Sequence, residues 1–300
     1  MIKEPLISVV MPAYNAGAFL VESIESITNQ SYKNFELIII NDGSTDDSGA
    51  IIAKYAEQDK RICVLSQKNK GIAVALNNGI KRSKGQYIAR MDADDISLKE
   101  RLMVQVEFLE KNPQIDVLGC NCSTIDNASN TTGRLINANT IKEIAATLCV
   151  HTPFTHSSLM LRKSLFEQYS YEDTPCEDYW LLAQCFNRGN FANINQVLLK
   201  YRHNYGHSLS DSKRMDMYAY NETVGRYFFN KHQTYLKQII NSQPDSKRFI
   251  HILSVMFIRG YVKFSMLCLL KSPRYWLVFP ALLVRHWLII NIERFKHLSI

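Results

Sequence analysis

The fold is decided by the stretch from Phe35 to Asp46, which reads FELIIINDGSTD. Its apolar run, Leu37–Ile40, predicts a strand that is buried on both faces, as in a parallel sheet with helices on its two sides. The change to Asn, Asp and Gly directly after this run predicts a turn at the carboxyl end of the strand. Ligands of open parallel sheets bind at these carboxyl ends. Polar residues that follow an apolar run are therefore the first candidates for a binding site.

Short apolar runs of the same kind alternate with helical patterns along the N-terminal part of the chain. Strands are predicted at Ile7–Met11, Phe35–Asn41, Ile62–Ser66, Tyr87–Met91 and Val117–Asn121. Helices are predicted between them at Phe19–Gln30, Ser48–Gln58, Ile72–Ser83 and Lys99–Asn112. The alternation predicts an α/β fold with a doubly wound, mostly parallel sheet.

The pattern is less regular after these elements. The polar segment Asn127–Asn139 is predicted to be a loop. A strand near Ser157–Leu161, a helix near Asp178–Asn187 and a strand near Asn195–Tyr201 are expected after it. Helical patterns follow from Ser208 onwards. The expected domains are therefore residues 1–210, which contain the sheet, and residues 211–300, a helical extension.

The composition is that of a folded globular chain. Of the 300 residues, 46% are hydrophobic and 21% are charged, which excludes a disordered protein. Seven cysteines are scattered without a CxxC pair, which indicates free thiols in a reducing, cytoplasmic compartment. The N-terminal residues lack the charged and apolar segments of a signal peptide.

The basic excess of the chain is confined to its C-terminal part. Residues 231–300 contain 11 Lys+Arg and 2 Asp+Glu, whereas residues 1–230 contain 24 and 26. Apolar runs alternate there with Lys and Arg at helical intervals, which favours an amphipathic helix on an anionic membrane surface over a nucleic-acid-binding groove. A helical cap packed on the rest of the chain is the other interpretation. No apolar stretch reaches the roughly 18 residues that a membrane-spanning helix needs.

The segment Arg90–Asp95, which reads RMDADD, places three carboxylates within four residues after a predicted strand. Such carboxylates repel one another unless a cation lies between them. Mg²⁺ or Mn²⁺ is the natural cation, because these ions take carboxylate and phosphate oxygens together. The alternative is an acidic start to the following helix. The place of the segment after a buried parallel strand favours a metal site.

Two further carboxylates are candidates for binding or catalysis. Asp42, at the tip of a turn, is suited to accept hydrogen bonds from a nucleobase or a ribose. The alternative is a structural turn before a helix that Asp46 or Asp47 caps. Asp178 opens a predicted helix, where it is either a cap or, if it faces the cleft, a general base.

Other residues and motifs narrow the choice of enzyme class. The sequence assigns no role to His156, His203 or His207. The GxxxxGK[ST], GxGxxG and GxSxG motifs of ATPases, dehydrogenases and hydrolases are absent. A nucleotidyltransferase that makes activated sugars is the alternative enzyme, but it would carry a basic, Gly-rich loop after the first strand. The segment Ala13–Gly17 has no Lys or Arg.

Four segments, in order, resemble glycosyltransferase family 2 with the GT-A fold, and most of all the bacterial enzymes of lipooligosaccharide and polysaccharide synthesis. They are SVVMPAYN at Ser8–Asn15, NDGSTD at Asn41–Asp46, YIARMDADD at Tyr87–Asp95 and CEDY at Cys176–Tyr179. The resemblance covers roughly residues 5–208. Asn204 stands where relatives often have His, after Tyr201 and Arg202.

The resemblance implies an inverting, metal-dependent hexosyltransferase. It would move a hexose or N-acetylhexosamine from a UDP-sugar to a hydroxyl of a glycan or lipid-linked acceptor, with a β-linkage, at the cytoplasmic face of a bacterial inner membrane. Asp92 and Asp94 would bind Mg²⁺ or Mn²⁺, and Asp178 would be the catalytic base. Tyr14 would stack near the uracil. The residues that would hold the nucleotide sugar are Pro12, Ala13, Tyr14, Asn15, Asp42, Arg90, Asp92 and Ala93.

Overall fold

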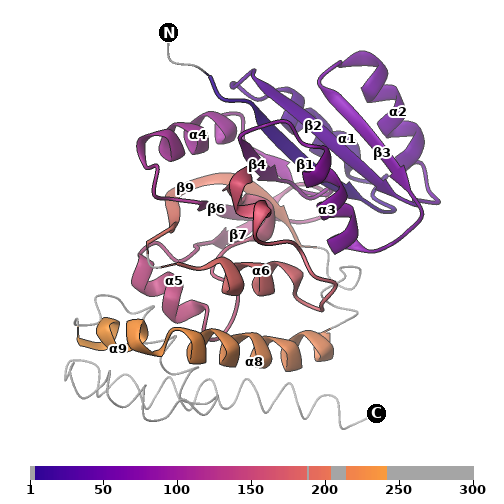
Figure 1. Cartoon of the computed structure of the whole chain (residues 1–300). Helices are drawn as coiled ribbons and strands as arrows, with labels where there is room; N and C mark the ends of the chain where they lie inside the picture. Colours follow the sequence, from indigo (N-terminus) through magenta and orange to yellow (C-terminus); the bar gives the residue numbers. More distant parts are fainter. Residues whose placement is uncertain (1–3, 188, 204–213, 242–300) are drawn as a thin grey trace.

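The computed structural model describes residues 4–187, 189–203 and 214–241 (Figure 1). Residues 242–300 of the basic tail, His207 and the domain boundary expected at residue 210 lie outside the described residues. The cysteines within the described part are free thiols, as predicted. In this part of the chain no helix combines the length and the apolar character that a membrane span requires.

The apolar runs form the parallel half of the sheet. Its strands lie in the spatial order β3-β2-β1-β4. Their bounds are Ile7–Ala13 for β1, Phe35–Asp42 for β2, Ile62–Gln67 for β3 and Tyr87–Arg90 for β4. The register pairs Ala13 with Asn41, and Val10 with both Ile38 and Arg90, so the strands end along a common edge.

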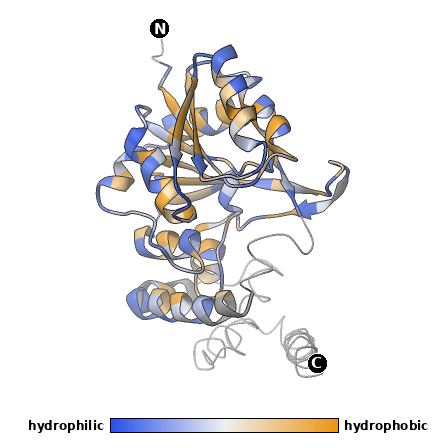
Figure 2. Ribbon diagram, turned by 90° about the vertical axis from the view of Figure 1, so that its right-hand side faces the viewer, coloured by the Kyte–Doolittle hydropathy of each residue, from blue (hydrophilic) through white to orange (hydrophobic). Residues whose placement is uncertain are grey.

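Helices cover both faces of these strands, as the buried apolar runs predict. Val9 and Leu37 face the helices α1 (Leu20–Thr28), α2 (Ser48–Gln58) and α4 (Arg101–Lys111). Val10 and Ile38, one position further along, face α3 (Ile72–Arg82) on the other side. The period of two along a strand therefore divides the core into two layers. Figure 2 shows the apolar strands between helices whose outer sides are hydrophilic.

Beyond β4 the sheet is mixed. β8 (Met160–Arg162) runs antiparallel to both β4 and β6 (Val117–Ile125). β9 (Phe191–Arg202) is parallel to β6 and antiparallel to β5 (Ile96–Ser97). The order is thus β3-β2-β1-β4-β8-β6-β9-β5 among the described strands. This half joins strands that are distant in the sequence.

Two local expectations were wrong. The segment Asn127–Asn139 is not a continuous loop, because β7 (Thr131–Leu135) pairs antiparallel with β6. None of its side chains is buried, so no apolar pattern marks it. The strand expected from Ser157 begins only at Met160. His156–Ser158 forms the 3₁₀ turn η1, in which the Ser158 hydroxyl donates to the Thr155 carbonyl over 2.7 Å.

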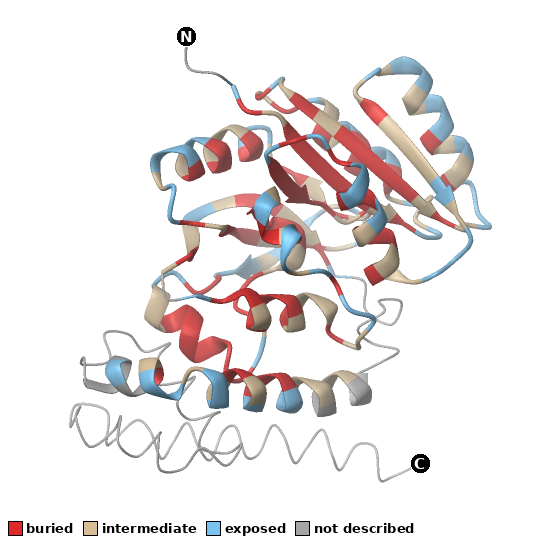
Figure 3. Cartoon of the chain, in the orientation of Figure 1, coloured by how far each residue is buried: buried red, intermediate tan, exposed pale blue. Residues whose placement is uncertain are grey.

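A helical layer lies below the sheet in Figure 1, formed by α5 (Ile141–Thr147), α6 (Glu177–Cys185), α8 (Arg214–Lys231) and α9 (Gln233–Asn241). Five of the seven residues of α5 are buried, as Figure 3 shows. A Cβ at Gly225 of α8 would lie 2.2 Å from the carbonyl oxygen of Cys149, so glycine permits the close approach of α8 to the end of α5. The described part of the C-terminal extension is therefore packed on the sheet domain.

Candidate active site

The loops after β1 and β2 are fastened to each other at the carboxyl edge of the sheet. The backbone N–H of Asn15 donates to the Ser44 hydroxyl over 3.1 Å, and the Asn15 side-chain oxygen accepts from the Thr45 N–H over 2.8 Å. Asn15 has a φ of 50°, in the left-handed region that asparagine tolerates better than most residues. The side-chain oxygen of Asn15 is thus committed to shaping this loop.

Three other predicted nucleotide-binding residues are on or next to β1. Ala13 is buried, Pro12 is half-buried, and the Tyr14 side chain is 51% exposed. The ring of Tyr14 is therefore accessible to a ligand at the carboxyl edge.

Asp42 is buried and holds the turn that precedes α3. Its carboxylate accepts from the Gln67 amide over 2.7 Å, from the Lys70 N–H over 2.9 Å and from the Gly71 N–H over 3.0 Å. A carboxylate offers about four acceptor positions. About one position is left for a ligand, so Asp42 has a structural role whether or not it also binds one.

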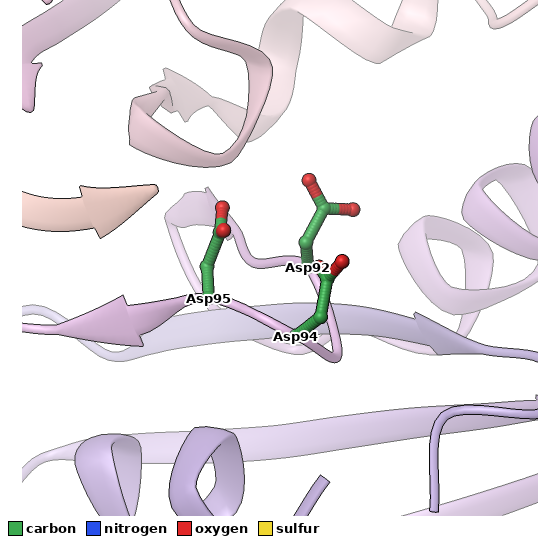
Figure 4. Close-up of side chains that lie close together, drawn as sticks. All are labelled: Asp92, Asp94 and Asp95. Carbon is green, nitrogen blue, oxygen red and sulfur yellow. The ribbon is translucent and has the colours of Figure 1, made fainter. Parts of the chain in front are cut away.

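The acidic loop, Asp92–Asp95, follows β4. Asp92, Asp94 and Asp95 each offer a carboxylate oxygen within 4.8 Å of the others (Figure 4). Ala93, between the first two, is buried. Both oxygens of Asp95 are already bonded, one to the Ser157 hydroxyl and the other to the Arg202 N–H at 2.8 Å. Asp95 is therefore already committed to bonds within the protein.

The crowded carboxylates disturb one another's ionisation. Burial, together with the charge of Asp92, raises the pKa of Asp94 to about 6. Burial, with the charges of Asp92 and Asp94, raises the pKa of Asp95 well above its ordinary value. A divalent cation would relieve this repulsion, and Mg²⁺ binds through one or two carboxylates plus phosphate oxygens. The donor set fits such an ion.

Arg90 lies beneath the acidic loop and is 2% exposed. It forms an ion pair with Asp92, and its Nε has no hydrogen-bond partner among the described residues. Burial alone would lower the pKa of Arg90, but Asp92 outweighs it and raises this pKa. A buried permanent cation is therefore held next to the acidic loop.

The first turn of α6 carries two further carboxyl groups. Burial raises the pKa of Asp178, which also responds to the charges of Arg90 and Asp92. Burial and the charge of Asp178 raise the pKa of Glu177 to about 8. Asp178 therefore lies within electrostatic range of Arg90 and Asp92.

The neighbours of Glu177 were not predicted as site residues. The His156 Nδ1 lies 3.7 Å from a Glu177 oxygen, beyond hydrogen-bonding distance. The His156 Nε2 is 2.8 Å from the hydroxyl of Tyr171. Burial and the charge of Arg90 lower the pKa of His156 well below its ordinary value, so the imidazole is neutral. No sequence pattern marks the pair His156 and Tyr171, because they meet only once η1 has folded against the segment that carries Tyr171.

Arg202, at the end of β9, is the other contact that the sequence did not reveal. Its N–H bonds to Asp95, and its Nε donates to the Asp94 carbonyl over 2.8 Å. His203 follows, with its N–H donating to the Ile125 carbonyl over 2.9 Å. The structure thus places Asp92, Asp94 and Asp178 in one region. The loops that carry Tyr14, Asn15 and Asp42 follow the adjoining strands β1 and β2.

Comparison with known proteins identifies the family. The sequence model of glycosyl transferase family 2 matches residues 8–170. A glycosyltransferase of Haemophilus influenzae is 35% identical over 66% of this chain and 65% of its own length. A glycosyltransferase of Methanocaldococcus jannaschii, MJ1057, is 34% identical over 76% of this chain and 81% of its own length. The chain thus spans just under two thirds of the first relative and most of the second.

Solved structures share the fold at lower identity. S. aureus TarS in complex with UDP-GlcNAc has a TM-score of 0.61 and 17% identity, over 97% of this chain and 92% of TarS. The mannosyltransferase PcManGT from Pyrobaculum calidifontis, in complex with GDP-Man and Mn²⁺, has a TM-score of 0.57 and 16% identity, over 94% of this chain and 86% of its own. The predicted GT-A type α/β fold is confirmed. The chain belongs to glycosyl transferase family 2.

Proposed function

We propose that the protein is an inverting glycosyltransferase that moves a hexose or N-acetylhexosamine from a UDP-sugar to a hydroxyl of a glycan or lipid-linked acceptor. The observation that carries the proposal is the arrangement of the acidic loop between the Tyr14 and Asp42 loops and the carboxyl group of Asp178. A nucleotide, a metal ion and an acceptor each find a suitable group there.

The choice of uridine rests on residues rather than on the fold, since TarS binds UDP-GlcNAc and PcManGT binds GDP-Man. Tyr14 presents an exposed ring on which a base can stack. Asp42, next to it on β2, has about one acceptor position left after its three internal bonds, which suits the single N–H of uracil. Pro12, Ala13 and Asn15 shape the wall between them.

Asp92 and Asp94 are the proposed ligands of Mg²⁺ or Mn²⁺. When bound, such an ion acts as a Lewis acid that neutralises the charge on the departing diphosphate. Arg90 holds Asp92 by an ion pair from below, and Ala93 gives the loop a small, buried side chain at this turn. The loop therefore presents two carboxylates and no bulky group to the nucleotide sugar.

Asp178 is the proposed base. The acceptor oxygen forms a bond to C1 of the donor sugar, the bond from C1 to UDP breaks with its electron pair, and the hydroxyl proton passes to Asp178. A single displacement inverts the anomeric centre, so an α-linked donor gives a β-linked product. General-base catalysis of this kind contributes about 10²–10⁴-fold in rate.

The acceptor and the location are proposed from the basic tail. Residues 231–300, with 11 Lys+Arg against 2 Asp+Glu, suit an anionic membrane surface. We therefore place the enzyme on the cytoplasmic face of a bacterial inner membrane, in the synthesis of lipooligosaccharide or surface polysaccharide. A lipid-linked acceptor would meet the enzyme on that surface.

The test is a screen of UDP-, GDP- and CMP-sugars, with nucleotide release and melting temperature as readouts, in Mn²⁺ and in EDTA. A UDP-sugar should raise the melting temperature by mass action, and UDP release should need the metal. Stabilisation by GDP-mannose alone would contradict the donor assignment. Full activity in EDTA would contradict the metal assignment, and release of pyrophosphate from UTP would indicate nucleotidyl transfer.

A further inference from the structure

Arg202 is an unusual residue for the end of a strand. It is 3% exposed, and its side chain is 0% exposed. A guanidinium group remains charged at every accessible pH, and burying it without partners is costly. Its contacts therefore show what the charge is used for.

On one side Arg202 holds the acidic loop. Its backbone N–H donates to a carboxylate oxygen of Asp95 over 2.8 Å, and its Nε donates to the carbonyl of Asp94 over 2.8 Å. Asp94 is itself a proposed metal ligand, and Asp95 follows it. One residue of β9 thus fixes the backbone of a ligand and the side chain of its neighbour.

On the other side Arg202 is anchored to two separate elements. Its Nη2 donates to Glu22 of α1 over 2.7 Å and to the Ser129 hydroxyl over 3.1 Å. Its Nη1 donates to the Asp126 carbonyl over 2.7 Å. The guanidinium carbon also lies 4.3 Å from the centre of the Phe19 ring. These contacts hold the plane of the guanidinium in one orientation.

Most hydrogen-bond donors of the Arg202 side chain are used within the protein, so Arg202 is not a ligand of the substrate. A guanidinium has five N–H groups, and four of them donate to Asp94, Asp126, Glu22 and Ser129. The side chain has no exposed surface through which to reach a diphosphate. Arg202 therefore acts on the site through the acidic loop.

Two serine hydroxyls also hold the acidic loop, at Asp95. The Ser157 hydroxyl donates to the second oxygen of Asp95, and the Ser23 hydroxyl donates to the Asp95 carbonyl over 2.7 Å. These bonds hold Asp95, and the Nε of Arg202 adds a bond to the Asp94 carbonyl. Loss of that bond would loosen the loop at a proposed metal ligand.

We propose that Arg202 is a positioning residue for the proposed metal site, which holds the Asp94 backbone and the Asp95 carboxylate so that the acidic loop is preformed for a divalent cation. The inference rests on the metal dependence in the proposed function. Loss of such an outer partner typically weakens metal binding about 10–100-fold. Arg202→Lys keeps the charge but loses the planar fork that reaches Asp94, Glu22 and Asp126 at once.

The experiment measures Mn²⁺ binding to the full-length protein with UDP present, from the electron paramagnetic resonance signal of free Mn²⁺. Arg202→Lys should weaken Mn²⁺ binding about 10–100-fold. Glu22→Ala removes the outer anchor and leaves Arg202 in place, so it should weaken binding by a smaller factor. Glu222→Ala breaks the exposed ion pair with Arg226 on α8, and as the matched control it should change nothing.

Activity gives a second readout that a general loss of stability would not produce. Both Arg202→Lys and Glu22→Ala should raise the Mn²⁺ concentration for half-maximal rate, with most of kcat recovered at saturating Mn²⁺. If Arg202→Lys does not fold, Glu22→Ala decides, because Glu22 is 50% exposed at its side chain. Wild-type Mn²⁺ affinity in folded variants would overturn the inference. A wild-type protein that binds no Mn²⁺ would instead overturn the proposed metal dependence.

Discussion

Replacing Asp94 by Asn should make the metal-free protein more stable while it abolishes metal binding. Burial and Asp92 raise the pKa of Asp94 from 3.8 to about 6. The folded state therefore prefers the protonated carboxyl, and ionised Asp94 costs stability. This cost is absent below about pH 4, grows as the pH rises through the raised pKa, and is complete above about pH 6. Two pKa units correspond to about 3 kcal/mol.

Asparagine removes the charge and should recover up to that amount at pH 8. At about 2 °C per kcal/mol for a chain of this size, the melting temperature in EDTA should rise by roughly 6 °C. Near pH 4 the variant should gain nothing. With Mn²⁺ at about 1,000 times Kd and UDP present, the wild type should instead melt at the higher temperature, because only the wild type is stabilised by the metal, by about 4.1 kcal/mol.

Differential scanning fluorimetry at pH 4, 6 and 8, with EDTA or with Mn²⁺ and UDP, measures both effects. Asp173→Asn is the control, since Asp173 is exposed and lies outside the acidic loop. It should leave the melting temperature unchanged at every pH. A metal-free Asp94→Asn protein that melts at or below the wild-type temperature at pH 8 would refute the argument from repulsion. Stabilisation of that variant by Mn²⁺ would refute the assignment of the ligand.

Three other outcomes are expected. Asp178→Asn should lower the transfer rate about 10²–10⁴-fold with UDP affinity unchanged. Burial raises the pKa of Asp178, so the wild-type rate should fall as the pH decreases through that raised value. Tyr14→Ala should weaken UDP binding by about 1–3 kcal/mol in calorimetry and leave the melting temperature unchanged, since the side chain is 51% exposed. Removal of the residues after Ser246 should release the protein from anionic vesicles and keep UDP-sugar stabilisation, whereas a truncated protein that unfolds would mean that the tail packs on the core.

The parallel half of the sheet could be predicted because each strand carries its own signal. Leu37–Ile40 is buried on both faces, so its apolar run is continuous and needs no partner to be recognised. Asp92 and Asp94 could be proposed for the same reason, since they directly follow the apolar strand Tyr87–Arg90. These features are local in the sequence.

The mixed half could not be predicted in this way. Thr131–Leu135 becomes a strand only by pairing its backbone with β6, and its exposed side chains show no alternation. Tyr171 reaches the site because Asn77 of α3 holds its backbone, accepting from its N–H over 3.0 Å and donating to its carbonyl over 2.7 Å. A contact between residues 94 positions apart leaves no pattern in either segment.

Asp94 and Asp95 show why residue type alone does not assign a role. The two are neighbours with the same side chain, and in the sequence only the family resemblance separates them. Asp95 has both oxygens bonded, by Ser157 and Arg202, at separations of 62 and 107 positions. Arg202 contacts Asp94 at its carbonyl, and the Asp94 carboxylate lies in the acidic cluster. The structural aspartate and the proposed ligand therefore differ in the contacts that distant elements make with them, and Arg202 contacts both.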